Sequence, residues 1–209
     1  MLRFSRVATL TGSPRRAMPW ATNITQYVNE HGSIPVTCWA AGFGFPIGTV
    51  AWTAMVESQA QLFAGTSQLL ADEGYLDLLD NAADLITTPG HDLLREVIYG
   101  QPGDPPPIGS VAVITTATAI VDRMADAIGW AVEIGQFVES TVGAPIAVLT
   151  DVFGTMGGIA WILAQPDFAT ADAGRAKLMA NADYLKHIAG SKDLFIPGSG
   201  HIGQAIRIA

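Results

Sequence analysis

The chain has 209 residues, of which 49% are hydrophobic and 14% charged, and this composition predicts a globular protein and excludes a disordered one. Its formal net charge of −8 argues against nucleic acid and anionic membrane surfaces as partners, because both reward clustered lysine and arginine. No apolar run reaches the roughly 18 residues that a membrane-spanning helix needs.

Cys38 is the single cysteine, which excludes an intrachain disulfide and a cysteine-rich metal site. Residues 1–10 lack the continuous apolar stretch and the cleavage site of a secretory signal, so we expect a cytoplasmic protein. The charged fraction lies below the roughly 25% of an average domain, which indicates that part of the protein surface is covered by another molecule instead of water. We therefore expect a homo-oligomer.

The first half of the chain alternates between strand and helix patterns. β-rich runs bounded by glycine or proline predict strands at residues 7–11, 34–41, 47–56 and 92–99. Apolar residues at helical spacing predict helices at residues 17–30 and 59–86, the second broken near Gly74. The order is βαββαβ, which is the ferredoxin-like unit.

A proline- and glycine-rich stretch at residues 101–109 predicts a linker, because proline fits neither a helix interior nor a central strand. After it the first half recurs at an offset of about 110 residues. The matched pairs are Trp20 and Trp130, Trp52 and Trp161, Tyr75 and Tyr184, and His91 and His201. We therefore predict two units, residues 1–100 and 110–209, related by a pseudo-twofold axis.

Residues 48–52, followed by Glu57-Ser58 and by a helix that ends in residues 70–75, resemble the dimeric α/β-barrel superfamily. The resemblance is strongest to its small stress-responsive and NIPSNAP-like members. It implies an α+β fold in which two tandem ferredoxin-like βαββαβ units form a pseudo-dimeric α/β barrel within one chain, around a central cavity. Activities in that superfamily include cofactor-independent monooxygenation, polyketide cyclisation, haem chemistry and plain ligand binding.

Asp151 stands where the first half has Ala41, inside the otherwise apolar run of residues 146–153. An ionised carboxylate among apolar residues costs several kcal/mol unless it is paired or functional. Asp151 is therefore a candidate general base with a raised pKa. The alternative is that it lies at a strand end and binds backbone amides of the following hairpin.

His91 and His201 open the last strand of each half, where they would frame a cavity mouth and titrate near neutrality. Alternation along the strands places Arg95 and Tyr99 on the face of His91, and Arg207 on the face of His201. If these faces line the cavity, the histidines are candidate catalytic residues, and Arg95 and Arg207 bind an anionic or carbonyl ligand. The alternative is a structural role in the turns for both histidines.

Trp39 and Phe43, together with Phe45, are candidate walls for a flat aromatic ligand, with plain hydrophobic packing as the alternative. His187 is the candidate axial ligand if haem is bound, although its place near a helix end explains it equally well. No other metal ligand set is predicted, and Cys38 is expected to be a buried, inert thiol.

The first functional hypothesis is a small-molecule-binding barrel that holds an apolar or aromatic ligand, as a cofactor-independent monooxygenase, a cyclase or a binding protein. The alternative is a non-enzymatic, homo-oligomeric assembly or interaction protein whose barrel is filled by side chains. The third is a haem-binding protein. Purifying the native assembly and identifying any compound that it retains distinguishes the first hypothesis from the second.

Overall fold

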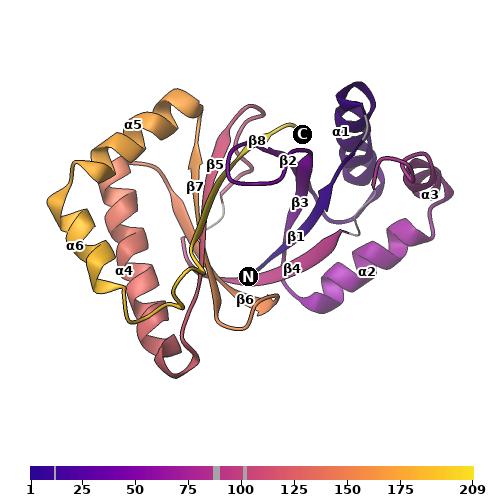
Figure 1. The fold of residues 1–209 in the computed structure, drawn as a ribbon. Helices are drawn as coiled ribbons and strands as arrows, with labels where there is room; N and C mark the ends of the chain where they lie inside the picture. Colours follow the sequence, from indigo (N-terminus) through magenta and orange to yellow (C-terminus); the bar gives the residue numbers. More distant parts are fainter. Residues whose placement is uncertain (12, 87–89, 101–102) are drawn as a thin grey trace.

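The computed structural model describes residues 1–11, 13–86, 90–100 and 103–209. Their strands close into one antiparallel barrel in the order β1-β3-β2-β8-β5-β7-β6-β4. The helices lie outside the barrel, with those of the first half on one side and those of the second half on the other (Figure 1). The fold is α+β, as predicted.

Each half contributes a run of strands to the barrel. The strands of the first half are β1 (Leu2–Thr9), β2 (Thr37–Ala41), β3 (Thr49–Val56) and β4 (His91–Tyr99). Those of the second half are β5 (Val111–Thr118), β6 (Ile146–Phe153), β7 (Gly158–Gln165) and β8 (His201–Arg207). The two runs are joined where β2 pairs with β8 and where β4 pairs with β6, so that the sheet has no free edge.

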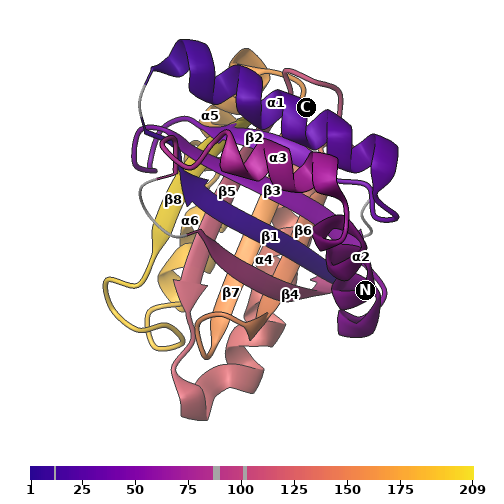
Figure 2. The same ribbon diagram turned by 90° about the vertical axis from the view of Figure 1, so that its right-hand side faces the viewer.

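Helices cover the outer face of the sheet (Figure 2). The first half supplies α1 (Pro14–His31), α2 (Gln59–Leu70) and α3 (Glu73–Asp80). The second half supplies α4 (Met124–Val142), α5 (Phe168–Met179) and α6 (Ala182–Gly190). Among the described residues, none of these helices combines the length and the hydropathy needed to cross a membrane.

Alternation along each strand divides its side chains between the barrel interior and the helices. On β1, Arg3, Ser5 and Val7 line the interior, whereas Phe4 and Arg6 face the helices. The strand order therefore creates two separate environments, one on each side of a single sheet.

Several predicted boundaries are corrected by the structure. β1 begins at Leu2 rather than at residue 7, because the residues from Leu2 onward pair with both β3 and β4 despite their two arginines. The break in the long helical segment falls before Gly74, since the Asp72 carboxylate accepts the Tyr75 amide at 2.9 Å and caps α3. Each half is thus βαββααβ rather than βαββαβ.

Tyr99 does not share the inward face of β4, contrary to the alternation argument. The register of β4 against β6 shifts between Val97 and Tyr99, and such a bulge turns the following side chain to the other face. The Tyr99 hydroxyl consequently hydrogen-bonds to Glu139 of α4, outside the barrel.

The two halves pack their outer layers differently. In the second half, Trp130, Trp161 and Phe195 form mutual edge-on contacts, with ring centroids 5.5 to 6.0 Å apart, at the centre of one large cluster. In the first half, Trp20 and Trp52 make the equivalent edge-on pair at 5.8 Å, but the surrounding apolar residues fall into several smaller clusters. The first half therefore has space that the second half fills.

Gly48, in the β2–β3 hairpin, provides a test of the backbone geometry. Its φ is +86°, and a Cβ there would collide with the Leu10 carbonyl oxygen. We expect Gly48→Ala to destabilise the protein by about 1–3 kcal/mol. The matched change Gly129→Ala, in α4 with nothing within 4 Å of the added Cβ, should instead stabilise it by up to about 1 kcal/mol. Urea titrations of both variants measure the difference, and equal midpoints would contradict the strain at Gly48.

Candidate functional site

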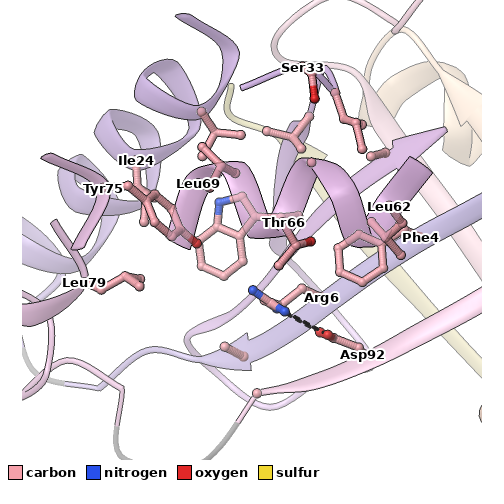
Figure 3. Close-up of a pocket in the computed structure, with 18 of the residues that line it drawn as sticks. Phe4, Arg6, Ile24, Ser33, Leu62, Thr66, Leu69, Tyr75, Leu79 and Asp92 are labelled. Carbon is pink, nitrogen blue, oxygen red and sulfur yellow. Dashed lines mark hydrogen bonds and ion pairs between the residues drawn. The ribbon is translucent and has the colours of Figure 1, made fainter. Parts of the chain in front are cut away.

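A cavity of about 490 Å³, here the helix–sheet cavity, lies between the sheet and the helices of the first half. Ile24, Leu69 and Tyr75 project into it from α1, α2 and α3, while Phe4 rises from β1 (Figure 3). Its volume falls within the roughly 300–1,000 Å³ typical of small-molecule sites. Apolar side chains predominate among its walls, with Ser33 and Thr66 as hydroxyl groups.

One wall of the helix–sheet cavity is a charged pair. Arg6 Nε and Nη2 donate to the two carboxylate oxygens of Asp92, each at 2.8 Å, which is a bidentate arrangement (Figure 3). The Asp92 carboxylate raises the pKa of Arg6, and the Tyr75 hydroxyl contributes to the same shift. Both charged side chains are nearly half exposed, at 43% and 48%, so the pair lies where the cavity meets solvent.

The second half lacks these features at the matching positions. Ile86 pairs with Leu10 as Phe195 pairs with Ala119, so Phe195 is the counterpart of Ile86. Its ring packs edge-on against both Trp130 and Trp161. At the offset of the repeat, Thr115 replaces Arg6 and Ile202 replaces Asp92. Sequence reasoning missed the helix–sheet cavity, although these differences between the halves were the signal that could have revealed it.

A second cavity of about 440 Å³, here the barrel cavity, lies inside the barrel. It brings together five residues predicted from the sequence, which are His91, His201, Arg95, Trp39 and Phe45. The inward face of β4 and β8 is therefore the face that carries the histidines. Arg3, which the sequence did not single out, lines the same cavity.

Asp151 also faces the barrel interior, but its carboxylate is fully engaged. One oxygen accepts from Arg95 Nε at 2.5 Å and the other accepts the Thr155 amide at 2.9 Å. The side chains of Arg95 and Asp151 are only 15% and 4% exposed. This geometry matches the alternative in which Asp151 binds the hairpin backbone, and it leaves the carboxylate poorly placed to act as a general base.

Two other predicted ligand contacts lie away from the barrel cavity. Phe43 is 79% exposed on the hairpin and does not line the cavity, whereas Phe45 does. Arg207 lies opposite Trp39 on β8, but its guanidinium donates to the carbonyl oxygens of Pro106 and Ala209. It therefore ties the chain segments at the end of β8 together rather than lining the cavity.

His187 does not fit the role of an axial haem ligand. Its ring packs against Phe137 of α4, with centroids 5.2 Å apart, and it lines neither of the two cavities. The described residues also contain no group of three or more His, Cys, Asp or Glu side chains placed to hold a metal ion. His187 instead joins α6 to α4, since its carbonyl oxygen accepts from Trp130 Nε1 at 3.2 Å.

No protein-family model matches the sequence, and no curated protein does so either. Solved structures nevertheless share its architecture. A protein described as a "putative monooxygenase" from Fusobacterium nucleatum has a TM-score of 0.73 at 8% identity, covering 100% of this chain and 92% of its own. An "anthrone oxidase-like protein" has a TM-score of 0.68 at 12% identity, covering 100% of this chain and 91% of its own.

A "putative monooxygenase" from Lactobacillus acidophilus has a TM-score of 0.63 at 13% identity, covering 99% of this chain and 93% of its own. At such identities the likeness concerns the fold. It confirms that the chain has the dimeric α/β-barrel fold that its sequence resembles.

The buried pair between Arg95 and Asp151 yields a stability prediction. Asp151→Asn removes the counter-charge of a mostly buried guanidinium, and we expect a loss of about 3–5 kcal/mol. The control is Asp84→Asn, which breaks the exposed pair with Arg16 and should change stability little. Urea unfolding measures both, and similar midpoints for the two variants would show that the buried pair contributes no more than a surface pair.

Cys38 is fully buried, and this burial raises the pKa of its thiol to about 12. The thiolate is the reactive form, so the folded protein should not react with a thiol reagent such as DTNB at pH 8. The same protein unfolded in guanidinium is the control and should release one equivalent of chromophore. Stoichiometric labelling of the folded chain would contradict the predicted burial.

Proposed function

We propose that this protein binds an apolar, ring-containing small molecule in the helix–sheet cavity and oxidises it with dioxygen without a bound cofactor. The observation that carries the proposal is the hollow beside Ile86, at the position where Phe195 fills the other half. A packed interior tolerates few voids, so a cavity of this size beside Ile86 indicates a binding site.

The charged pair at the edge of the cavity gives the proposal a chemical form. A ring methylene beside a carbonyl loses a proton most readily when the oxygen of the resulting enolate is stabilised. Arg6 supplies the positive charge for that oxygen. Asp92 accepts the proton once one of its two oxygens is released from Arg6, a release that its 48% exposure permits and that the 4% exposure of Asp151 does not. The overall change is CH₂ + O₂ → C=O + H₂O, which balances with dioxygen as the oxidant and water as the second product.

The structural neighbours support this chemistry only by analogy of fold. One of them is described as anthrone oxidase-like, and anthrone is a flat tricyclic compound with such a methylene. Anthrone is therefore a suitable first substrate, and anthraquinone a suitable unreactive ligand.

We also propose that the halves are duplicated ferredoxin-like units, residues 1–100 and 110–209, joined by residues 101–109. The shared element order and the nearly constant offset of about 110 residues support the duplication. Residues 101 and 102 of that linker lie outside the described residues.

A homo-oligomer remains our expectation, because large apolar side chains are exposed on the β2–β3 and β6–β7 hairpins. They include Phe43, Ile47 and Met156, which are 79%, 99% and 75% exposed. Native mass spectrometry reports the assembly mass. A discrete oligomer that neither retains nor binds a small molecule would favour the alternative of an assembly protein.

The experiment that tests the proposed function exchanges the residue that distinguishes the halves. Ile86→Phe introduces the ring that packs against both tryptophans in the second half, and we expect at least about tenfold weaker anthraquinone binding because the larger side chain narrows the cavity. Anthrone-dependent oxygen uptake should fall in parallel. Isothermal titration calorimetry and an oxygen electrode provide the two readouts.

The matched control is Phe195→Ile, which alters the second half and should leave both readouts near those of the unmodified protein. Arg6→Gln separates chemistry from binding, since it should lower the rate of oxygen uptake more than the affinity for anthraquinone. Equal effects of Ile86→Phe and Phe195→Ile would refute the placement of the site in the first half.

A further inference from the structure

Arg3 is a charged residue of the barrel cavity without a counter-charge. Its Nε atom is buried and has no hydrogen-bond partner. Its Nη2 atom is 3.5 Å from Thr53 Oγ1, at the outer limit of a hydrogen bond. No carboxylate of the described residues lies within ion-pair distance of it. The guanidinium therefore has N–H donors inside the protein that are not hydrogen-bonded.

The neighbours of Arg3 add to its positive charge rather than offset it. Arg95 is its direct partner across the β1–β4 ladder, and like charges in that position repel. Burial, together with Arg95, lowers the pKa of Arg3 to about 10, so Arg3 remains charged at neutral pH. Asp151 balances Arg95 alone, while His91 and His201 are the other titratable groups that line the cavity.

A second polar group of the same cavity is also unpaired. Thr49 is 7% exposed, lines the barrel cavity, and its hydroxyl oxygen has no hydrogen-bond partner. Buried polar groups are almost always hydrogen-bonded. Two unpaired polar groups on one cavity therefore indicate that a molecule bound in the cavity supplies their hydrogen-bond partners. Thr49 lies toward the hairpin end of the barrel, and Arg3 toward the opposite end of β1.

A large part of the remaining wall of the barrel cavity is apolar. Trp39, Phe45, Leu93, Ile114 and Ile162 line it, and its volume is about 440 Å³. We infer that the barrel cavity binds a small organic anion, a carboxylate carried on an apolar ring, with the carboxylate on Arg3 and the ring against these walls. Guanidinium and carboxylate match in geometry and charge, which makes the carboxylate the natural partner.

This site is distinct from the one proposed above for oxidation. Arg3 and Arg6 lie on opposite faces of β1, so the two cavities are separated by the sheet. The inference does not rest on the proposed function, and each can fail without the other.

The test compares 2-naphthoate with 2-naphthamide, which has nearly the same shape but no charge, by calorimetry at pH 7. We expect the naphthoate to bind at least about tenfold more tightly, because a hydrogen bond to a charged group contributes more than a neutral one. Arg3→Met keeps the apolar stem and should weaken naphthoate binding about 10- to 100-fold, with little change for the amide. Arg3→Lys, which keeps the charge, should retain the preference for naphthoate.

Three controls fix the interpretation. Arg16→Met removes a surface arginine and should leave naphthoate binding unchanged. Ile86→Phe, which blocks the helix–sheet cavity, should also leave it unchanged. The melting temperature of Arg3→Met should equal or exceed that of the unmodified protein, since an unpaired buried charge is lost. Equal binding of the two probes, a lower melting temperature in Arg3→Met with unchanged naphthoate binding, or loss of naphthoate binding in Ile86→Phe would overturn the inference.

Discussion

Closure of the barrel at the seam between β4 and β6 is the constraint on which the rest of the structure depends. Here the last strand of the first half pairs with the second half, and the ladder shifts register between Leu94 and Arg95. The buried pair of Arg95 and Asp151 lies at that shift, and Asp151 also holds the Thr155 amide of the next hairpin. A charged contact with such directional bonds fixes one register where a purely apolar seam would permit slippage.

Closure also makes the two faces of every strand unequal. On β1, Arg6 faces the helices and is held by Asp92, whereas Arg3 faces the barrel without a carboxylate. The same strand thereby forms the common wall of two cavities with different electrostatics. A ligand of the helix–sheet cavity meets a paired, partly solvated arginine, while a ligand of the barrel cavity would meet an unpaired one.

The sequence predicted the architecture well because duplication and alternation are both visible as residue patterns along the chain. The strand of residues 92–99, the hairpin around Phe43 and Phe45, and the shared face of His91 and Arg95 needed only spacing and turn residues, whereas the inward direction of that face came from the structure. The turn of Tyr99 to the outer face was not accessible, because a bulge depends on the register of a strand that is distant in sequence. Nor was the pairing of Asp151 with Arg95, which are 56 residues apart.

The cavities were harder to predict for a different reason. A cavity is defined by what neighbouring side chains fail to fill, and Ile86 looks like any other core residue until it is placed beside Trp20 and Trp52. Comparison of the halves makes the difference visible, since Phe195 at the position of Ile86 packs against both corresponding tryptophans.

Duplication also explains how the fold can remain stable with a cavity in its first half. Apolar burial and close packing provide most of the favourable free energy of folding, and voids reduce it. The second half concentrates its aromatic residues in one packed cluster around Trp161, and the continuous barrel joins that cluster to the first half. Because the sheet is shared, stability gained on one side of the molecule supports a more loosely packed helical layer on the other. A single, undivided copy would have to meet both demands with the same residues, so the proposed division of packing and ligand binding between the halves follows from having two.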